Sequence, residues 1–335
     1  MSLKAPKKIL ILRFSSIGDI VLTFPVVRSL KAAYPECQID FVTKKAYQSL
    51  LNACEGINEV FTLDNSLRTL KKQIDFRTYD AVLDLHHNLR TQLLTFFTGA
   101  KVYRFPKNNW QKWLLTCFKI MPKKRSHVVE RYFMTLRAAF GLEIRALQGK
   151  YLVPIQDQIN IEDEIGFKPK EYLAFAVGAQ FSTKRLPTDL MINLIEQVHC
   201  PIVLIGGPED VLVANQIKLA LPNQQIVSKV GQLSIHASAW LVQNAAALLT
   251  HDTGLMHVGA SFDVPIHLIW GNTTPAFGMY PLRHDQENCF HYEVQDLTCR
   301  PCSKIGHQSC PKGHFACMRR QDLNHIANQL NAIEI

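Results

Sequence analysis

The stretch Lys8-Ile9-Leu10-Ile11-Leu12-Arg13-Phe14-Ser15-Ser16-Ile17-Gly18-Asp19 joins a continuous apolar run to a polar turn that contains a glycine. The run Lys8–Phe14 is typical of a strand that is buried on both faces of a sheet. Ile20–Ala33 follows with apolar residues at helical spacing. A strand, a turn and a helix in this order predict the first βα unit of a parallel, doubly wound sheet.

Short apolar runs and helical patterns keep alternating along the 335 residues. We expect further strands at Gln38–Thr43, Glu59–Leu63, Ala81–Leu85, Tyr172–Val177, Pro201–Ile205, Ala245–Thr250 and Pro265–Trp270. We expect helices at Pro187–Val198, Glu209–Leu221, Ser234–Gln243, Gly254–Ser261 and Gln321–Ile333. The pattern predicts an α/β fold with two Rossmann-like, doubly wound domains that face each other across a cleft. We place them at residues 1–155 and 156–320, with a helix at 321–335 that packs back on the first domain.

The net charge of +9 is concentrated in one segment. Residues 85–129 contain nine Lys and Arg and no Asp or Glu, so this segment carries the whole excess. A localised basic segment indicates an anionic partner, which is a nucleic acid, a phosphorylated substrate or an anionic lipid. The sequence contains neither a signal peptide nor an apolar run long enough to span a membrane, so we expect a cytoplasmic protein with reduced cysteines.

Asp19 ends the opening stretch and has two interpretations. Ser16 and Asp19 match the spacing of a helix capping box, and an acidic residue in a first helical turn suits the helix dipole. Alternatively, the Asp19 carboxylate is a general base that takes a proton from an acceptor hydroxyl. The turn alone favours the capping interpretation.

Three further turns follow expected strands of the second half. His251-Asp252-Thr253-Gly254-Leu255-Met256-His257 places backbone N–H groups and a hydroxyl at a helix start, where anions bind. Gly178–Pro187 contains Ser182, Thr183, Lys184 and Arg185, which are side chains that bind phosphate. Gly206-Gly207-Pro208-Glu209 offers a carboxylate to ribose hydroxyls. Each turn alone also fits an ordinary cap or a solvated surface, but three turns at one sheet edge favour a nucleotide site.

These motifs resemble glycosyltransferase family 9, the ADP-heptose:lipopolysaccharide heptosyltransferases. The resemblance covers nearly the whole chain and rests on ILRFSSIGDIVLTFPVVRSLK, DLHHNLRT, IGGPED and HDTGLMHVGAS in combination. It implies a GT-B fold and a transfer that inverts the anomeric carbon without a covalent intermediate. It also implies a nucleotide-sugar donor, ADP-heptose, and a lipopolysaccharide-precursor acceptor at the cytoplasmic face of the inner membrane.

The resemblance assigns roles by motif position. It makes Asp19 the catalytic base. The implied donor-binding residues are Thr183, Lys184, Arg185, Glu209, Asp252, Thr253, Gly254, Leu255 and His257. The implied acceptor-binding residues are Ser16, Gly18, Asp84, Asn88, Arg90 and Arg131, the last within a segment with His127 and Tyr132. The chain contains no Asp-x-Asp motif, so we expect fixed positive groups in place of a metal ion at the diphosphate, and no required cofactor.

The basic segment interleaves its Lys and Arg with aromatic residues from Phe96 to Phe118. This composition fits peripheral contact with an anionic membrane surface, and it also fits RNA binding. The third interpretation is an ordinary solvated face over core aromatics. The phosphorylated lipid acceptor favours the membrane, and nucleic acid is the less favoured partner.

Four of the nine cysteines lie within nineteen residues, at Cys299, Cys302, Cys310 and Cys317. His307 and His314 lie among them. This spacing in a reducing compartment is compatible with a structural zinc site, with a loop of free thiols and with disulfides.

The leading hypothesis is an inverting heptosyltransferase. One alternative keeps the fold and mechanism but uses another nucleotide sugar or glycan acceptor. An alternative of another class is an RNA-binding protein that uses the basic segment 85–129.

Overall fold

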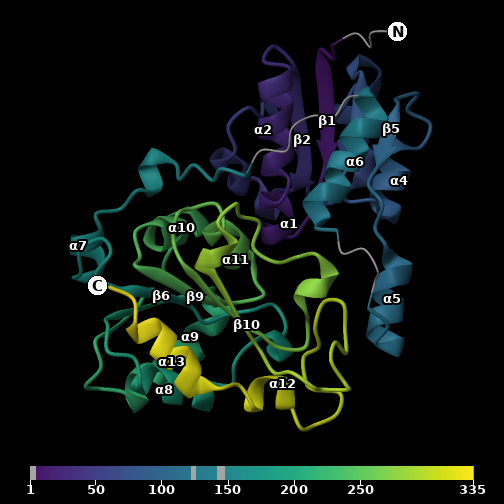
Figure 1. The fold of residues 1–335 in the computed structure, drawn as a ribbon. Coiled ribbons are helices and arrows are strands. Elements are labelled where there is room, and N and C mark those ends of the chain that lie inside the picture. Colours follow the sequence, from purple (N-terminus) through teal and green to yellow (C-terminus); the bar gives the residue numbers. More distant parts are fainter. Residues whose placement is uncertain (1–4, 122–125, 142–147, 335) are drawn as a thin grey trace. The chain divides into compact units, whose positions relative to one another are not determined.

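The computed structural model describes residues 5–121, 126–141 and 148–334, and its chain divides into two compact units (Figure 1). The first unit comprises Met1–Asn108 and Ser126–Leu152, and the second comprises Asn109–Arg125 and Val153–Ile335. Residues 109–125 therefore group with the second unit, although the sequence places them within the first domain.

The first unit is built on a five-stranded parallel sheet with the order β3-β2-β1-β4-β5. Its strands are β1 (Lys8–Leu12), β2 (Gln38–Lys44), β3 (Glu59–Leu63), β4 (Ala81–Asp84) and β5 (Val102–Arg104). Its α-helices are α1 (Ile17–Val21), α2 (Phe24–Ala33), α3 (Leu67–Gln73), α4 (Leu89–Thr95) and α6 (Val128–Phe140). The apolar side chains of β1 are fully buried on both faces of the sheet, as its continuous apolar run predicts.

The helix that we expect over Ile20–Ala33 is divided into α1 and α2. Pro25 lies in the first turn of α2. Proline has no backbone N–H and therefore cannot extend the hydrogen-bond ladder of α1, whereas the first turn of a new helix tolerates it. The short α1 thus carries Asp19 in its own first turn.

The second unit is built on a six-stranded parallel sheet with the order β11-β10-β9-β6-β7-β8. Its strands are β6 (Leu173–Ala176), β7 (Ile202–Ile205), β8 (Ile226–Ser228), β9 (Ala247–His251), β10 (Ile266–Trp270) and β11 (Cys289–Glu293). Its α-helices are α5 (Asn109–Phe118), α7 (Ile161–Ile165), α8 (Thr188–Glu196), α9 (Val211–Ala220), α10 (Ile235–Gln243), α11 (Gly254–Gly259), α12 (Ala316–Arg319) and α13 (Leu323–Asn331). Helices α8, α9 and α13 cover one face, and α10 and α11 cover the other (Figure 1).

The C-terminal helix α13 belongs to the second unit. Its buried residues Ile326, Ala327 and Leu330 join the same core as α8 and the strands of the second sheet. The apolar face of α13 is therefore buried within its own unit, and packing of this helix on the first domain stays a prediction.

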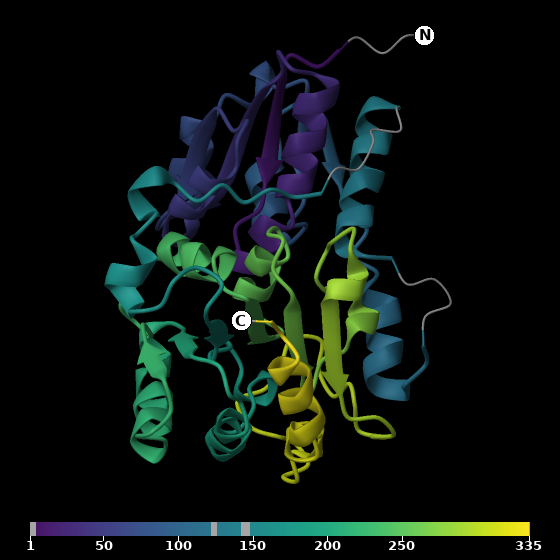
Figure 2. The ribbon, with the colours of Figure 1, turned by 60° about the vertical axis from the view of Figure 1, so that its left-hand side comes forward.

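Helix α5 also packs within the second unit. Figures 1 and 2 both show it beside the yellow-green chain that follows β10. Lys119 Nζ donates a hydrogen bond of 2.7 Å to the carbonyl of Pro301. Leu115 and Lys119 line a cavity of about 640 Å³ with Glu293 and Arg300. These contacts explain why residues 109–125 group with the second unit.

Candidate active site

Two of the sequence-predicted turns lie side by side at the carboxyl edge of the first sheet. Strands β1 and β4 are neighbours, and Leu12 is in register with Asp84. The turn that follows β1 therefore lies next to the turn that follows β4. This arrangement brings Ser16, Gly18 and Asp19 to the same edge as Asp84 and Asn88.

The Asp19 carboxylate is held by groups of its own turn. Its Oδ1 lies 2.5 Å from Nη2 of Arg13. Its Oδ2 accepts hydrogen bonds from the Ser16 hydroxyl at 2.9 Å and from the Ser16 backbone N–H at 3.2 Å. The Asp19 side chain is 23% exposed, so solvent reaches it. Asp19 thus makes the local contacts of a capping residue while its carboxylate stays accessible.

Arg13 connects three parts of this edge, a role that the sequence does not reveal. It binds Asp19, and its Nη1 donates to the carbonyl of Leu85 at 2.5 Å and to the hydroxyl of Tyr132 at 3.2 Å. Burial alone would lower the pKa of Arg13, but the Asp19 carboxylate and Tyr132 outweigh it and raise that pKa. Burial also raises the pKa of Tyr132 to about 12. A permanently charged guanidinium therefore lies against Asp19 and fixes its position.

His86 adds a neutral ring beside this pair. Burial, and next the charge of Arg13, lower the pKa of His86 to about 3. The ring also contacts Phe14 at a centroid distance of 5.4 Å. His86 therefore stays uncharged near neutral pH and does not compete with Arg13 for the Asp19 carboxylate.

The turn after β4 is organised by a fully buried carboxylate. Asp84 accepts hydrogen bonds from the backbone N–H groups of His86 and His87 at 3.1 and 2.6 Å and from the Thr91 hydroxyl at 2.8 Å. Asn88 caps α4 by accepting the Thr91 N–H at 3.0 Å. Arg90, in the first turn of α4, is exposed to solvent. Asp84 and Asn88 therefore shape this turn, and Arg90 presents its charge at the surface.

Arg131 is buried in α6 and is only 2% exposed. Its Nη1 donates to the carbonyls of Pro106 and Lys107 at 3.3 and 2.9 Å. Its Nε and Nη2 have no hydrogen-bond partner among the residues that the structure describes, and burial lowers the pKa of Arg131. His127, also buried, caps the same helix. These contacts anchor α6 to the 106–107 loop, and contact between Arg131 and an acceptor stays a prediction.

Three turns of the second unit meet at the carboxyl edge of its sheet, since β6, β9 and β10 are consecutive neighbours. Lys184, at the end of a short 3-10 helix after β6, lies 2.7 Å from Oδ2 of Asp252, which follows β9. Thr273, which follows β10, donates its hydroxyl hydrogen to the same Oδ2 at 2.8 Å. The structure thus brings together Lys184 and Asp252, which the sequence predicts, and adds Thr273, which it does not.

The start of α11 completes this edge. Thr253 is the cap of α11 and accepts the N–H of Met256 at 3.4 Å. The first-turn N–H groups of Gly254 and Leu255 point away from the helix body, as in any helix start. His257 is buried in α11 and only 5% exposed. The hydroxyl and N–H groups can therefore bind an anion beside Lys184, whereas His257 offers little surface to a ligand.

In the turn after β7, the carboxylate that points into the protein belongs to Asp210 and not to Glu209. Glu209 is exposed, whereas Asp210 is 2% exposed and lies 3.0 Å from Nη1 of Arg185. A Cβ at Gly178 would lie 1.9 Å from the Asp210 carboxylate, so only glycine admits it there. Burial raises the pKa of Asp210, and Arg185 opposes this shift. The charge of Arg185 is therefore paired within the protein, and ribose binding by Glu209 stays a prediction.

Thr183, also predicted to bind the donor, is 2% exposed. Its hydroxyl donates to Oδ1 of Asn272 at 3.1 Å and accepts the N–H of His307 at 2.8 Å. Its side chain therefore joins the turn after β6 to two other segments of the second unit instead of facing solvent.

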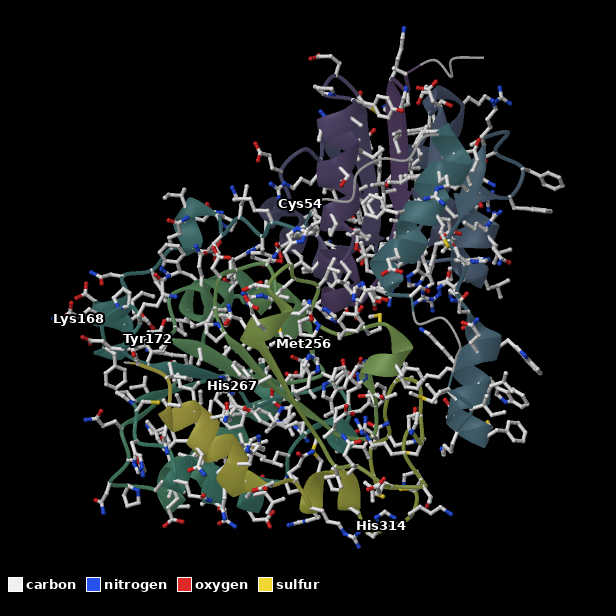
Figure 3. All side chains as sticks on the ribbon, viewed as in Figure 1. Cys54, Lys168, Tyr172, Met256, His267 and His314 are labelled. Carbon is white, nitrogen blue, oxygen red and sulfur yellow. The ribbon has the colours of Figure 1, made fainter. Side chains whose placement is uncertain are left out.

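The four clustered cysteines, which lie in the segment before and within α12, do not form a metal site in this geometry. All nine cysteines are free thiols. Cys299 Sγ lies 3.9 Å from Nε2 of His314, which Figure 3 labels near α12. Among the described residues, no group of three or more His, Cys, Asp or Glu is arranged to hold a metal ion. Burial raises the pKa of Cys317 to about 12, which favours its thiol form.

The structural zinc site therefore stays a prediction, and it has a direct test. If Cys302, Cys310 and the other two cysteines close around a metal in solution, elemental analysis of the purified chain will show about one zinc per chain, from the spacing of four thiolates. The variant Cys200→Ser, which changes a cysteine outside the cluster, should leave the zinc content unchanged, and Cys302→Ser should lower it. A wild-type preparation without zinc contradicts the prediction.

No helix in the described ranges has the length and the apolar composition that crossing a membrane requires.

Comparison with known proteins fits this arrangement. Residues 67–308 match the model of glycosyltransferase family 9 (heptosyltransferase). Lipopolysaccharide heptosyltransferase 2 of Salmonella typhimurium is 25% identical over 307 residues, covering 83% of this chain and 86% of that protein. Lipopolysaccharide heptosyltransferase 1 of Pseudomonas aeruginosa is 25% identical over 323 residues, covering 89% and 86%.

Solved structures show the same fold. The ADP-heptose lipopolysaccharide heptosyltransferase II of E. coli superposes with a TM-score of 0.69 at 23% identity, covering 97% of this chain and 100% of that one. A family 9 glycosyltransferase of Veillonella parvula gives 0.71 at 20% identity, covering 87% and 86%. These neighbours confirm the GT-B fold class with two Rossmann-like units. With its family model matched over 67–308, the chain belongs to glycosyltransferase family 9 (heptosyltransferase).

Proposed function

We propose that this chain is an inverting glycosyltransferase that moves heptose from ADP-heptose to the inner core of lipopolysaccharide. Its family and the names of its relatives support a glycosyltransferase and favour heptose as the sugar. The observation that carries the proposal is the joint placement of Lys184 and the Asp252–Leu255 turn at one sheet edge. A cation, a hydroxyl and helix N–H groups at one edge are the groups that bind a nucleoside diphosphate without a metal ion.

The donor half of the proposed mechanism concerns the leaving group. Lys184 Nζ has three N–H donors, and Asp252 takes two of them, through its Oδ2 at 2.7 Å and its carbonyl at 3.4 Å. The third N–H is directed to a diphosphate oxygen. Thr253 and the N–H groups of Gly254 and Leu255 bind the same diphosphate. These groups stabilise the negative charge that develops when the bond to the sugar breaks.

The acceptor half of the mechanism concerns Asp19. The acceptor oxygen attacks the anomeric carbon on the face opposite the diphosphate, and the electron pair of the breaking bond leaves with the diphosphate. The Asp19 carboxylate takes the hydroxyl proton as the new bond forms. Arg13 and Ser16 hold the carboxylate in place for this transfer. Attack from the opposite face inverts the anomeric carbon, so no covalent sugar–enzyme intermediate is needed.

The remaining acceptor-side residues divide by exposure. Arg90 is exposed and binds a phosphate group of the acceptor in this proposal. Ser16 and Gly18 shape the turn that carries Asp19. Asp84 and Asn88 support the turn that carries Arg90.

A transfer assay tests the proposal. The purified chain is incubated with a lipopolysaccharide-precursor acceptor and one donor at a time: ADP-heptose, ADP-glucose, UDP-glucose or UDP-N-acetylglucosamine. The masses of the products are measured by mass spectrometry. We expect a mass increase of one heptose with ADP-heptose alone. Transfer from another donor supports the alternative sugar. If RNA raises the unfolding temperature of the chain and ADP does not, the glycosyltransferase hypothesis is rejected in favour of the RNA-binding alternative.

We also propose that the chain acts as a peripheral protein at the cytoplasmic face of the inner membrane, and that α5 makes the contact. Three aromatic side chains of α5 are exposed: Trp110 by 67%, Trp113 by 39% and Phe118 by 59%. Ile120 and Met121 extend this apolar surface. Exposed aromatics within a basic segment favour an anionic lipid surface.

We expect the double variant Trp110→Ser/Phe118→Ser to bind anionic vesicles about tenfold more weakly or worse, because two large side chains lose their lipid contact. The measurement is co-sedimentation with vesicles of phosphatidylcholine and phosphatidylglycerol at low and high salt. Leu212→Ser/Leu219→Ser is a matched control, since these residues of α9 are 76% and 82% exposed. Equal vesicle binding by the aromatic variant and the wild type contradicts the contact.

A further inference from the structure

Arg300 lies in the segment that follows β11, between the clustered cysteines, and its side chain is 9% exposed. Its Nε donates to the carbonyl of Gly271 at 2.7 Å and to that of Thr273 at 3.1 Å. Its Nη2 donates to the Thr273 carbonyl at 2.7 Å and pairs with Glu293 at 2.6 Å. The Arg300 guanidinium therefore holds the turn after β10 in place by hydrogen bonds to two backbone carbonyls of that turn.

That turn, Gly271–Thr273, contacts the donor-side groups in two places. The Thr273 hydroxyl binds the Asp252 carboxylate, which in turn binds Lys184. The Asn272 N–H donates to the Thr183 carbonyl at 3.2 Å, and the Thr183 hydroxyl donates to Oδ1 of Asn272 at 3.1 Å. The turn thus touches both the carboxylate that holds Lys184 and the residue directly before Lys184.

The contact between these turns leaves little room for movement. A Cβ at Gly271 would lie 2.3 Å from the Thr183 carbonyl and 3.4 Å from Cα of Lys184, so the backbones approach closer than any side chain would allow. The segment that carries Arg300 reaches Thr183 a second time, where the Thr183 hydroxyl accepts the His307 N–H at 2.8 Å and the Thr183 N–H donates to the His307 carbonyl at 3.2 Å. A shift of the Gly271–Thr273 turn would therefore move Lys184.

We propose that Arg300 is a positioning residue for Lys184 and sets the affinity of the donor site through the Gly271–Thr273 turn. This inference rests on the proposed function, in which Lys184 binds the donor diphosphate. Arg300 donates its hydrogen bonds to protein groups and acts through Thr273 and Asp252. The planar guanidinium of Arg300 donates to two carbonyls and a carboxylate at the same time, and the single ammonium group of a lysine cannot reproduce this geometry.

The test is a double-mutant cycle read by the affinity for ADP in isothermal titration calorimetry. We expect Arg300→Lys to weaken ADP binding about tenfold, in the range found for residues that act through others. In a Lys184→Met background, the same change should alter ADP affinity less than twofold, because the residue through which Arg300 acts is gone. The proposal is overturned if the losses of ADP affinity caused by Arg300→Lys and by Lys184→Met are additive in the double variant. It is also overturned if Arg300→Lys alone leaves the affinity for ADP unchanged.

Arg283→Lys is the matched control. Arg283 is also a buried arginine of the second unit, and it binds the carbonyl of Val264 and the carboxylate of Asp285. Its loss should lower the unfolding temperature without changing ADP affinity. If Arg300→Lys does not fold, Thr273→Val serves instead, because it removes the hydroxyl that links the turn to Asp252.

The outcomes separate this inference from the proposed function. If wild-type chain binds no ADP, the donor assignment fails and the role of Arg300 fails with it. If ADP binds and Lys184→Met weakens it, but Arg300→Lys and Thr273→Val bind ADP like the wild type, the donor assignment stands and only the inference about Arg300 is overturned.

Discussion

Replacing Asp19 with asparagine is expected to lower the transfer rate by about 10³-fold, within the usual range for a lost general base. Asparagine keeps the shape of the side chain and can still accept the Ser16 hydrogen bond, but it cannot take the acceptor proton. The second unit, which holds the proposed donor groups, is unchanged. The affinity for ADP should therefore stay within about twofold of wild type, as measured by calorimetry beside a single-turnover transfer assay.

Stability must be followed in the same variant, because Arg13 is buried and loses its carboxylate partner. A thermal unfolding curve shows whether the loss of rate comes from unfolded protein. Asp64→Asn is the matched control, since Asp64 is an exposed carboxylate of the first unit whose side chain is 56% exposed. Asp64→Asn should transfer at the wild-type rate. Near-normal turnover by folded Asp19→Asn would refute the assignment of the base.

Lys184→Met is expected to weaken ADP binding about 100-fold, which corresponds to the loss of a charge-assisted hydrogen bond to the diphosphate. Two effects act in the same direction. The diphosphate loses a cation, and the Asp252 carboxylate, only 12% exposed, loses its partner and repels the anionic ligand. Calorimetry with ADP measures the change, and the transfer rate at saturating donor shows how much of it is binding.

The second effect can be separated from the first. Adding Asp252→Asn to Lys184→Met removes the repelling charge and should recover about tenfold of the lost affinity. Lys168→Met is the control, because Lys168 is exposed at the periphery of the second unit near α7, as Figure 3 shows. An unchanged ADP affinity in Lys184→Met would remove Lys184 from the donor site.

The central strands could be predicted from the sequence, whereas most edge strands could not. Strands such as β1, β6 and β9 are covered on both faces and therefore appear as continuous apolar runs. Three strands escaped prediction, namely β5, β8 and β11, and each lies at the edge of its sheet. Their side chains are mostly half-buried, so they lack the continuous apolar run that marks a central strand.

The candidate site shows a similar division. Motif spacing identified the turns that carry Asp19, Lys184 and Asp252, because a parallel sheet brings the ends of neighbouring strands to one edge. It did not show which carboxylate of the turn after β7 points inward. Asp210 does so because Gly178 and Gly206 leave space for it, and this depends on the packing of two strands. The linking roles of Arg13 and Arg300 also depend on packing, since Arg13 donates to the distant carbonyl of Leu85 and Arg300 to that of Gly271.

The grouping of residues 109–125 with the second unit means that the chain passes between the two units three times, at 108/109, 125/126 and 152/153. The two units therefore do not correspond to two continuous segments of sequence that could be exchanged with a relative. A chimera made with a relative by one crossover near residue 152 would combine a foreign α5 with the native loop around Pro301, which Lys119 binds. Exchange of donor specificity between relatives by recombination requires that 109–125 travel together with 153–335, which takes three breakpoints instead of one.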